Sequence, residues 1–568
     1  MNKKLQTLRR GQLKIFNPLE ANPQLFREII GKISGKNIFI TSLLSMLVQI
    51  FVVALYFGKL PDIAQKRLQY SRYCTGLRDN HATKSLCLKN IKGWSINWEL
   101  FWHDIFIFFT IASIVILLVI STFMIIADLV QEEKTGTLNF IRLSPQSASK
   151  ILFGKIVGVP ILVNFFVATI FPLHLISALK ANIPWYLILS FDLIVIAGCA
   201  FVYSFSGLFA LVRMEKSELK PWIATFVVAC FFLITTCIFF DNYDINNSLA
   251  EWLLIFNPIL ALTYVLEPIS VAGDLVDYID LNSLSQLSFY GQHLWSNAIT
   301  GMGFILFNYC LWTYWLWQGA TRLFHNPTST IFSKKQSYWI TGWFVAISLG
   351  FTLQINGDYN KLAENFIILQ CLLFAMLLGL VAALSPHRQK LYDWARYRHQ
   401  LSKNGKSLVQ ELVFGEKSPS SVAIAINAAI TIIIIAMGLL IFPSQKAGAE
   451  AIGGFVLTMG MILLYSVIVQ WMLLMKSHKR VLWTSITISL LILLPPILFA
   501  IADVTPQNVP LAWFFSSVPF VGIEYANVSA LILGVLGQWL AITFVSFQMM
   551  RKLRQAGRSE TQKILAST

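Results

Sequence analysis

Residues Asn37 to Gly58 read NIFITSLLSMLVQIFVVALYFG, an uncharged run that is long enough to cross a bilayer as one helix. Eleven further runs of spanning length follow it, each bounded by charge, Pro or Asn. They lie at residues 105–127, 151–178, 185–212, 222–240, 294–318, 338–355, 365–385, 421–442, 451–475, 481–502 and 527–549. The sequence therefore predicts an all-α polytopic membrane protein with about 12 transmembrane helices.

The composition excludes a soluble enzyme. Of the 568 residues, 56% are hydrophobic and 13% are charged, whereas a soluble chain carries about 25% charged residues. The mean hydropathy is +0.64. Because the residues before Asn37 are polar and basic, we expect no cleavable signal peptide and a cytoplasmic N-terminus.

The distribution of basic residues predicts the topology. With twelve spans and both termini in the cytoplasm, 33 of the 44 Lys and Arg residues fall on the inside, as the positive-inside rule requires. The remaining 11 lie outside, eight of them in the loop 59–104. The net charge of +16 therefore reflects orientation in a plasma (inner) membrane, and we expect membrane lipid but no nucleic acid as a partner.

The two halves of the chain resemble each other. Asn22-Pro23 precedes the first span and Asn326-Pro327 precedes the seventh, each followed by a basic segment. Two weaker apolar runs, 252–272 and 511–524, contain Pro and Glu and stand before spans six and twelve, so we interpret them as re-entrant or interfacial helices. The pattern predicts a parallel 6 + 6 pseudo-repeat.

These signals define a predicted domain organisation. It consists of a cytoplasmic elbow region 1–36, a first six-span half 37–318 with the outside loop 59–104 and the segment 129–150, a cytoplasmic linker 319–337, a second half 338–549 with the cytoplasmic segment 386–420, and a basic cytoplasmic tail 550–568.

The most specific local signal is residues 132–155, EEKTGTLNFIRLSPQSASKILFGK. Gly136 is expected to break the preceding helix, and Thr137 to cap a short amphipathic helix that Pro145 ends. Ser147 or Ser149 would start span three, with Lys150 and Lys155 at the membrane interface. On the residues alone, an amphipathic connector lying on the lipid headgroups explains this segment.

The order acidic-acidic-basic-X-Gly-Thr-Leu, then Ser-Pro, then Ile-Leu-X-Gly-Lys resembles the permease subunits of ABC-2-type exporters. The resemblance covers nearly all of the first half and implies that the segment docks on a cytoplasmic ATPase. The residues to which it assigns that contact are Glu132, Glu133, Gly136, Thr137, Leu138 and Pro145. Residues 407–417, SLVQELVFGEK, lack Gly-Thr-Leu, so the coupling roles of Glu411 and Glu416 rest on repeat position alone.

The chain has no Gly-X-X-X-X-Gly-Lys-Ser/Thr phosphate loop, no catalytic constellation and no expected metal site. The resemblance therefore implies a transporter subunit that is not itself an enzyme and binds no cofactor directly. ATP and Mg²⁺ would be held by separate ABC ATPase subunits, two copies for the two halves. The alternatives are an ATP-independent secondary transporter and a membrane scaffold protein, and no residue identifies the substrate.

Two smaller groups of residues complete the sequence-based expectations. Cys74 and Cys87 both fall in the outside loop, where they either form a disulfide or remain free thiols. Asp192 lies within a span, so it is a candidate for the substrate path or for a packing hydrogen bond to Asn164 or His174. The acidic segment 241–292 either attracts a leaving cation or reflects the topology rule.

Overall fold

The computed structural model describes residues 22–61, 70–76, 85–90, 93–212, 217–240, 248–266, 288–353, 359–400, 408–441 and 445–557. Within this part of the chain, ten helices are long and apolar enough to cross a membrane. They are Gly35–Phe57, Trp98–Thr135, Ile161–Lys180, Trp185–Leu211, Lys220–Ile238, Lys361–Leu384, Ser421–Ile441, Ala451–Leu473, Arg480–Ile501 and Val528–Gln555. The prediction of a helical, multi-pass membrane protein is confirmed.

The two remaining predicted spans also form helices, but they are not among those ten. Residues 294–318 lie mostly in α15 (Ala298–His325), and residues 338–355 lie mostly in α16 (Lys334–Thr352). Trp, Tyr and polar residues replace part of the aliphatic content of these helices, for example Asn308 and Trp312 in α15. Length alone makes both able to span a bilayer at 1.5 Å per residue.

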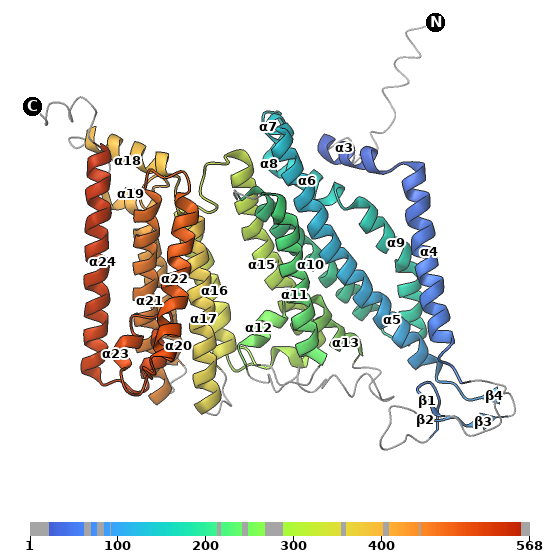
Figure 1. The fold of residues 1–568 in the computed structure, drawn as a ribbon. Coiled ribbons are helices and arrows are strands. Elements are labelled where there is room, and N and C mark those ends of the chain that lie inside the picture. Colours follow the sequence, from blue (N-terminus) through green and yellow to red (C-terminus); the bar gives the residue numbers. More distant parts are fainter. Residues whose placement is uncertain are drawn as a thin grey trace, which may run out of the picture. The chain divides into compact units, whose positions relative to one another are not determined.

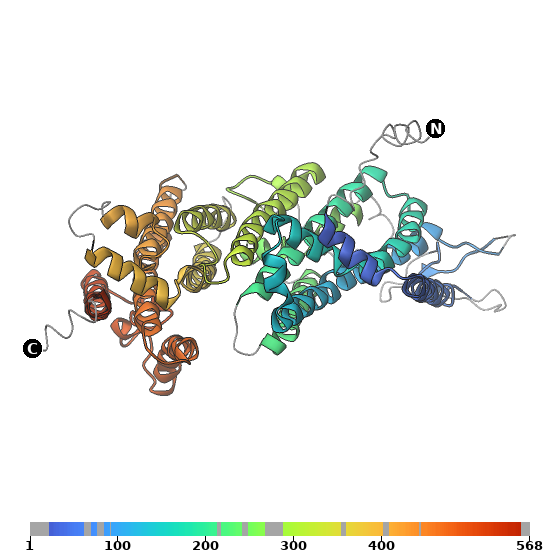
Figure 2. The same ribbon diagram turned by 90° about the horizontal axis from the view of Figure 1, so that it is seen from above.

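The chain divides into two compact units (Figure 1). Unit 1 comprises residues 1–243, 254–284 and 298–325, and unit 2 comprises residues 244–253, 285–297 and 326–568. The main division after His325 falls inside the predicted linker 319–337. Figure 2 shows many of the long helices close to end-on, packed beside their neighbours within each unit.

Unit 1 is built around the long helical segments Trp98–Thr135 and Trp185–Leu211. Its helices are α3 (Pro23–Lys32), α4 (Gly35–Phe57), α5 (Trp98–Val115), η1 (Ile116–Ile120), α6 (Ser121–Thr135), α7 (Thr137–Arg142), α8 (Ala148–Gly158), α9 (Ile161–Lys180), α10 (Trp185–Leu211), η2 (Ser217–Leu219), α11 (Lys220–Phe240), η3 (Pro258–Ala261), α13 (Leu262–Leu266) and α15. α10 packs along α15 and α6, and α5 packs along α9. Helix α5, the π-helical turn η1 and α6 follow one another without a break, and Tyr203 of α10 donates to the Leu117 carbonyl inside that turn.

Unit 2 consists of α16, α17 (Tyr359–Leu384), α18 (Arg388–Gln400), α19 (Leu408–Phe414), α20 (Ser421–Ile441), α21 (Gln445–Leu473), α22 (Arg480–Ile501), α23 (Pro510–Trp513), η7 (Pro519–Gly522) and α24 (Val528–Gly557), with most of α12 (Ala250–Leu254) and η6 (Leu294–Ser296). α21 contacts α17, α20 and α24, which places it at the centre of the unit. α22 and α24 expose most of their apolar side chains, as expected for helices that face lipid.

The predicted re-entrant runs form short helical turns rather than spans. The first contains α12, η3 and α13, interrupted at Asn257, whose side chain accepts from the Ile259 amide and donates to two threonine hydroxyls of α11. The second contains α23 and η7. Of the acidic residues noted in 241–292, only Glu251 lies among the described residues.

The predicted outside loop carries the few strands of the described structure. β1 (Tyr70–Ser71) pairs antiparallel with β2 (Ser85–Leu86), with Ser71 opposite Ser85. β3 (Lys89–Asn90) pairs with β4 (Gly93–Trp94). Cys74 and Cys87 form a disulfide within the loop. Arg72 makes a bidentate ion pair with Asp104 in the first half of α5. These links fix the described part of the loop to the helical bundle.

Candidate docking site around the α6–α7 turn

The turn between α6 and α7 is built on Gly136. Its φ of +76° ends α6 in the left-handed conformation, which glycine adopts without steric cost. Thr137 is the first residue of α7 and makes no capping bond to it, which corrects the expectation that Thr137 caps this helix. Its hydroxyl instead donates to the Glu132 carbonyl at 3.2 Å, satisfying one of the free carbonyls at the end of α6.

Helix α7 has one anchored face and one free face. Leu138 and Ile141 are buried, with exposed fractions of 1% and 8%. Phe140 is 79% exposed, and Leu143, the residue that follows the helix, is 84% exposed. The segment therefore presents two large apolar side chains on a short helix whose other face holds it to the protein. Pro145 is exposed in the bend that leads to α8, where Ser147 caps the helix start.

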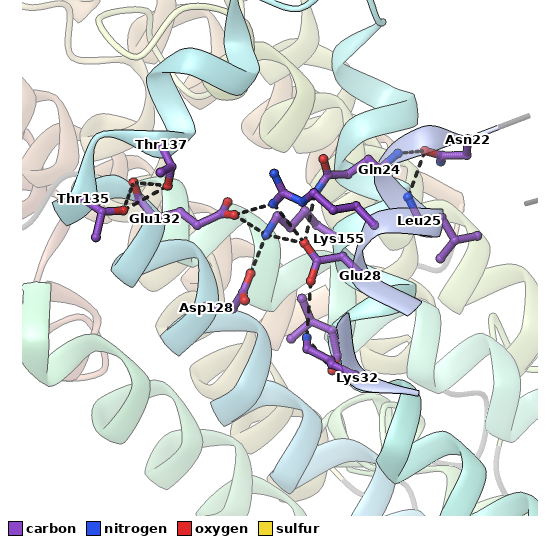
Figure 3. A network of polar contacts seen from close by, with 12 residues as sticks. Asn22, Gln24, Leu25, Glu28, Lys32, Asp128, Glu132, Thr135, Thr137 and Lys155 are labelled. Atoms are coloured by element: carbon purple, nitrogen blue, oxygen red, sulfur yellow. Dashed lines mark hydrogen bonds and ion pairs between the residues drawn. The ribbon is translucent and has the colours of Figure 1, made fainter. Parts of the chain in front are cut away.

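Behind this turn lies a buried charge network (Figure 3). The Lys155 Nζ of α8 lies 2.7 Å from carboxylate oxygens of Glu28, Asp128 and Glu132. Arg27 also reaches Glu132, at 2.7 Å, and Glu28, at 3.2 Å. Lys32 lies 3.4 Å from Glu28, so three basic groups balance three carboxylates in a network that joins α3, α6 and α8.

The electrostatics of the network favour its charged form. Burial lowers the pKa of Lys155, but the charge of Asp128 and hydrogen bonds to the carboxylates outweigh this, so its pKa is raised. Burial likewise raises the pKa of the Glu28 carboxyl, but the hydrogen bond and charge of Lys155 dominate and lower it. The three carboxylates lie close enough together to ligate a metal ion, yet the Lys155 ammonium already lies among them and supplies the positive charge.

The glycines of α8 explain how α3 approaches so closely. A Cβ at Gly154 would lie 2.7 Å from the Leu25 amide nitrogen of α3, and a Cβ at Gly158 would lie 2.6 Å from the Glu28 Cβ. The two glycines are four residues apart, on one face of the helix. The Gly-Lys pair that ends residues 132–155 therefore has a structural role, because Gly154 admits α3 and Lys155 binds it.

Unit 2 also holds a short helix with exposed apolar side chains. In α19, Val409 and Phe414 are exposed. The buried Lys334 of α16 donates to the Leu412 and Pro419 carbonyls and to the Ser418 hydroxyl, all within 2.9 Å. Tyr338 donates to the Val413 carbonyl at 2.7 Å, so α16 holds α19 along its backbone.

The two glutamates predicted for this region differ in exposure. Glu411 accepts a hydrogen bond from the Trp394 indole at 3.1 Å, and Glu416 is exposed beyond the end of α19. Figure 1 shows α18 and α19 together, at the end of unit 2 opposite α23.

Asp192 pairs with the histidine named from the sequence. Its carboxylate lies 3.5 Å from His174 Nε2, whereas Asn164 Oδ1 lies 3.2 Å from the Tyr203 hydroxyl. The Thr110 hydroxyl donates to the Phe106 carbonyl and lies 3.2 Å from His174 Nδ1. His174 Nε2 and Asp192 Oδ2 are both buried and make no hydrogen bond within the described part of the chain, so the pair is held by proximity alone.

The structure separates the residues that the sequence placed on one docking surface. Gly136, Thr137 and Pro145 are exposed, and Glu133 is half-buried. Leu138 is buried and anchors α7, while Glu132 belongs to the Lys155 network. Phe140 and Leu143, which form the exposed apolar face, were not singled out from the sequence. Their three-residue spacing on a short amphipathic helix was the available signal.

Comparison of the chain with protein-family models, characterised proteins and solved structures finds no match.

Proposed function

We propose that this chain is the permease subunit of an ATP-binding cassette exporter of the ABC-2 type, in which α7 transmits movement from a separate ATPase. The observation that carries the proposal is the exposed apolar pair Phe140 and Leu143 on an anchored helix. Exposed apolar residues grouped on a rigid element are typical of protein contact surfaces.

The charge network gives α7 a mechanical connection to the membrane helices. Glu132 and Asp128 lie on α6, which continues through η1 into α5. A displacement of α7 would act on α6 directly and on α3 and α8 through Lys155. A push at the turn would therefore reach both the elbow and the long helix, as coupling requires.

In this proposal the two units are the two halves of a 6 + 6 permease, and both termini and α7 face the cytoplasm of a plasma (inner) membrane. α19 forms the second docking element, held by Lys334 in place of an ion-pair network. Two ATPase copies would hydrolyse ATP with Mg²⁺, and the docking would be asymmetric because α19 lacks the Gly-Thr-Leu turn.

The test is to purify the tagged chain from its native host in mild detergent and to assay for a co-purifying ATPase inhibited by vanadate. The variant is Phe140→Ser with Leu143→Ser, which removes the exposed apolar face and leaves Leu138 and Ile141 in place. We expect wild type to retain the ATPase and the double variant to lose most of it.

The matched control is Leu440→Ser at the end of α20, because Leu440 is 82% exposed and lies at the predicted outer end of its helix. This control should retain the ATPase. Absence of a phosphate-loop ATPase from the wild type, or equal retention by the double variant, would contradict the proposal.

A second candidate function, transport driven by an ion gradient, is favoured by the close approach of the ionisable pair Asp192 and His174 within the membrane helices. In that case proteoliposomes of the purified chain would take up protons with substrate, and Asp192→Asn would abolish the coupling. ATP-driven transport would instead require the ATPase and would not need a proton gradient.

A further inference from the structure

A cavity of about 660 Å³ opens within unit 2, where residues 520–525 form part of its wall. Its described walls come from the start of α17, from α21, from the loop after α22 and from residues 520–525. The volume is typical of sites that bind small organic molecules. Neither the ATPase contact nor the Lys155 network uses this cavity.

The wall of the cavity combines apolar surface with negative charge. Phe366, Ile367 and Phe520 supply apolar area, and Tyr525 adds an aromatic ring. Glu364 and Glu524 also line it, and no Lys or Arg is among the described lining residues. Two carboxylates beside aromatic rings attract a cation, and the apolar wall favours a ligand that carries hydrocarbon.

The side-chain amide of Gln370 adds a polar group to the cavity wall. Gln370 is 3% exposed and lines the cavity. Its Oε1 accepts a hydrogen bond from the Thr458 hydroxyl at 3.4 Å. A side-chain amide at a cavity wall can offer a ligand both a donor and an acceptor.

From this arrangement we infer that the cavity binds an amphiphilic organic cation. The ligand carries an amine or quaternary ammonium group near Glu364 and Glu524, an apolar body along Phe366 and Phe520, and an acceptor atom for Gln370. The same chemistry is found in a free amphiphilic cation and in a lipid with an ammonium headgroup. The inference does not rest on the proposed ATPase coupling.

The test measures the binding of rhodamine 6G, a fluorescent cation with an apolar ring system and an ester, to the purified full-length chain by fluorescence anisotropy. We expect saturable binding at one site and weaker binding of rhodamine B, whose carboxylate offsets its positive charge. The double variant Glu364→Gln with Glu524→Gln should weaken rhodamine 6G binding at least about tenfold, because two charge-assisted contacts are lost. Gln370→Leu should weaken it severalfold.

The control is Asp503→Asn, which removes a negative charge near the same end of unit 2 but does not line the cavity. Asp503 has a φ of +52°, a conformation that Asn tolerates. Binding to this variant should stay within about twofold of wild type. Each variant is first shown to elute as a monodisperse species with wild-type helix content.

Competition then identifies the source of the ligand. Displacement of rhodamine 6G by sphingosine, a single-chain lipid amine without a phosphate, assigns the site to a lipid headgroup, and displacement by tetraphenylphosphonium alone assigns it to free cations. No saturable binding, or equal binding to wild type and the double glutamine variant, would overturn the inference. Because the assay contains no ATPase, its result is independent of the co-purification experiment.

Discussion

At the scale of single residues, Lys155 is the group on which the elbow helix α3 depends. The sequence placed it at the membrane interface, where a lysine side chain extends toward water. The structure instead buries it among Glu28, Asp128 and Glu132. The sequence could not show this, because Glu28 lies more than a hundred residues away and its approach depends on the packing of α3 against α8.

Replacing Lys155 with Met should destabilise the protein by about 3–5 kcal/mol, because three carboxylates would lose the cation they share. The measurement is the thermal unfolding midpoint of the purified chain in detergent. Lys150→Met is the control, since Lys150 is exposed on the same helix and should have a small effect. Equal midpoints for the Lys155 variant and wild type would refute the structural role of the network.

Lys334 provides a pH-dependent prediction. It precedes the predicted span of α16, and its burial lowers its pKa from 10.5 to about 8. Between those values the unfolded state binds more protons than the folded state, so stability rises with pH across this window. Wild type should therefore gain stability relative to Lys334→Met between about pH 8 and about pH 10.5. The control Lys335→Met, an exposed neighbour, should keep the wild-type pH profile, and a flat profile for wild type would be evidence against the assignment.

Replacing Gly154 or Gly303 by Ala should change the unfolding midpoint of the protein differently at the two positions. Both lie inside helices, where Ala is favoured over Gly by about 1 kcal/mol. A Cβ at Gly303 meets no described atom within 4 Å, so Gly303→Ala should leave the unfolding midpoint unchanged or raise it. Gly154→Ala should lower it, because the added Cβ contacts the backbone of α3. The same sign for both substitutions would show that α3 does not require this close approach.

At the scale of elements, the apolar runs predicted the positions of most helices but not their full lengths. Span two was expected at residues 105–127, and the helix extends from Trp98 to Thr135 because backbone hydrogen bonds continue beyond the apolar part. The short helix after Gly136 was expected, but its exposed face was not identified. Hydrophobic patterning shows that a helix is amphipathic; it does not show which apolar side chains remain uncovered.

The outside loop is held by a disulfide that the sequence left open. Cys74 and Cys87 are 13 residues apart, and closing a loop of that size stabilises a folded state by about 3 kcal/mol. Cys74→Ser with Cys87→Ser should lower the unfolding midpoint, and treatment of wild type with reductant should produce the same decrease. A thiol-reactive reagent should label these positions in denatured wild type only after reduction. Labelling without reduction would show that the disulfide is absent.

At the scale of the whole molecule, composition was sufficient to predict a helical membrane protein, and the positive-inside bias yields a testable orientation. The predicted domain boundaries, the 6 + 6 repeat and both cytoplasmic termini remain predictions. Single cysteines at Leu143 and at Asp503, in a background without the native cysteines, should differ in their reaction with a membrane-impermeant maleimide on intact cells. We expect labelling at Asp503 alone. Labelling at Leu143 would show that the orientation is the reverse of the predicted one.

The central claim is that α7 contacts an ATPase, and the most direct measurement is photocrosslinking in intact cells. A photoreactive amino acid at Phe140 should form a crosslink to a protein that mass spectrometry identifies as a phosphate-loop ATPase, while the same amino acid at Leu440 should not. A crosslink from Phe140 only to lipid would instead support a connector lying on the headgroups and would contradict the coupling function.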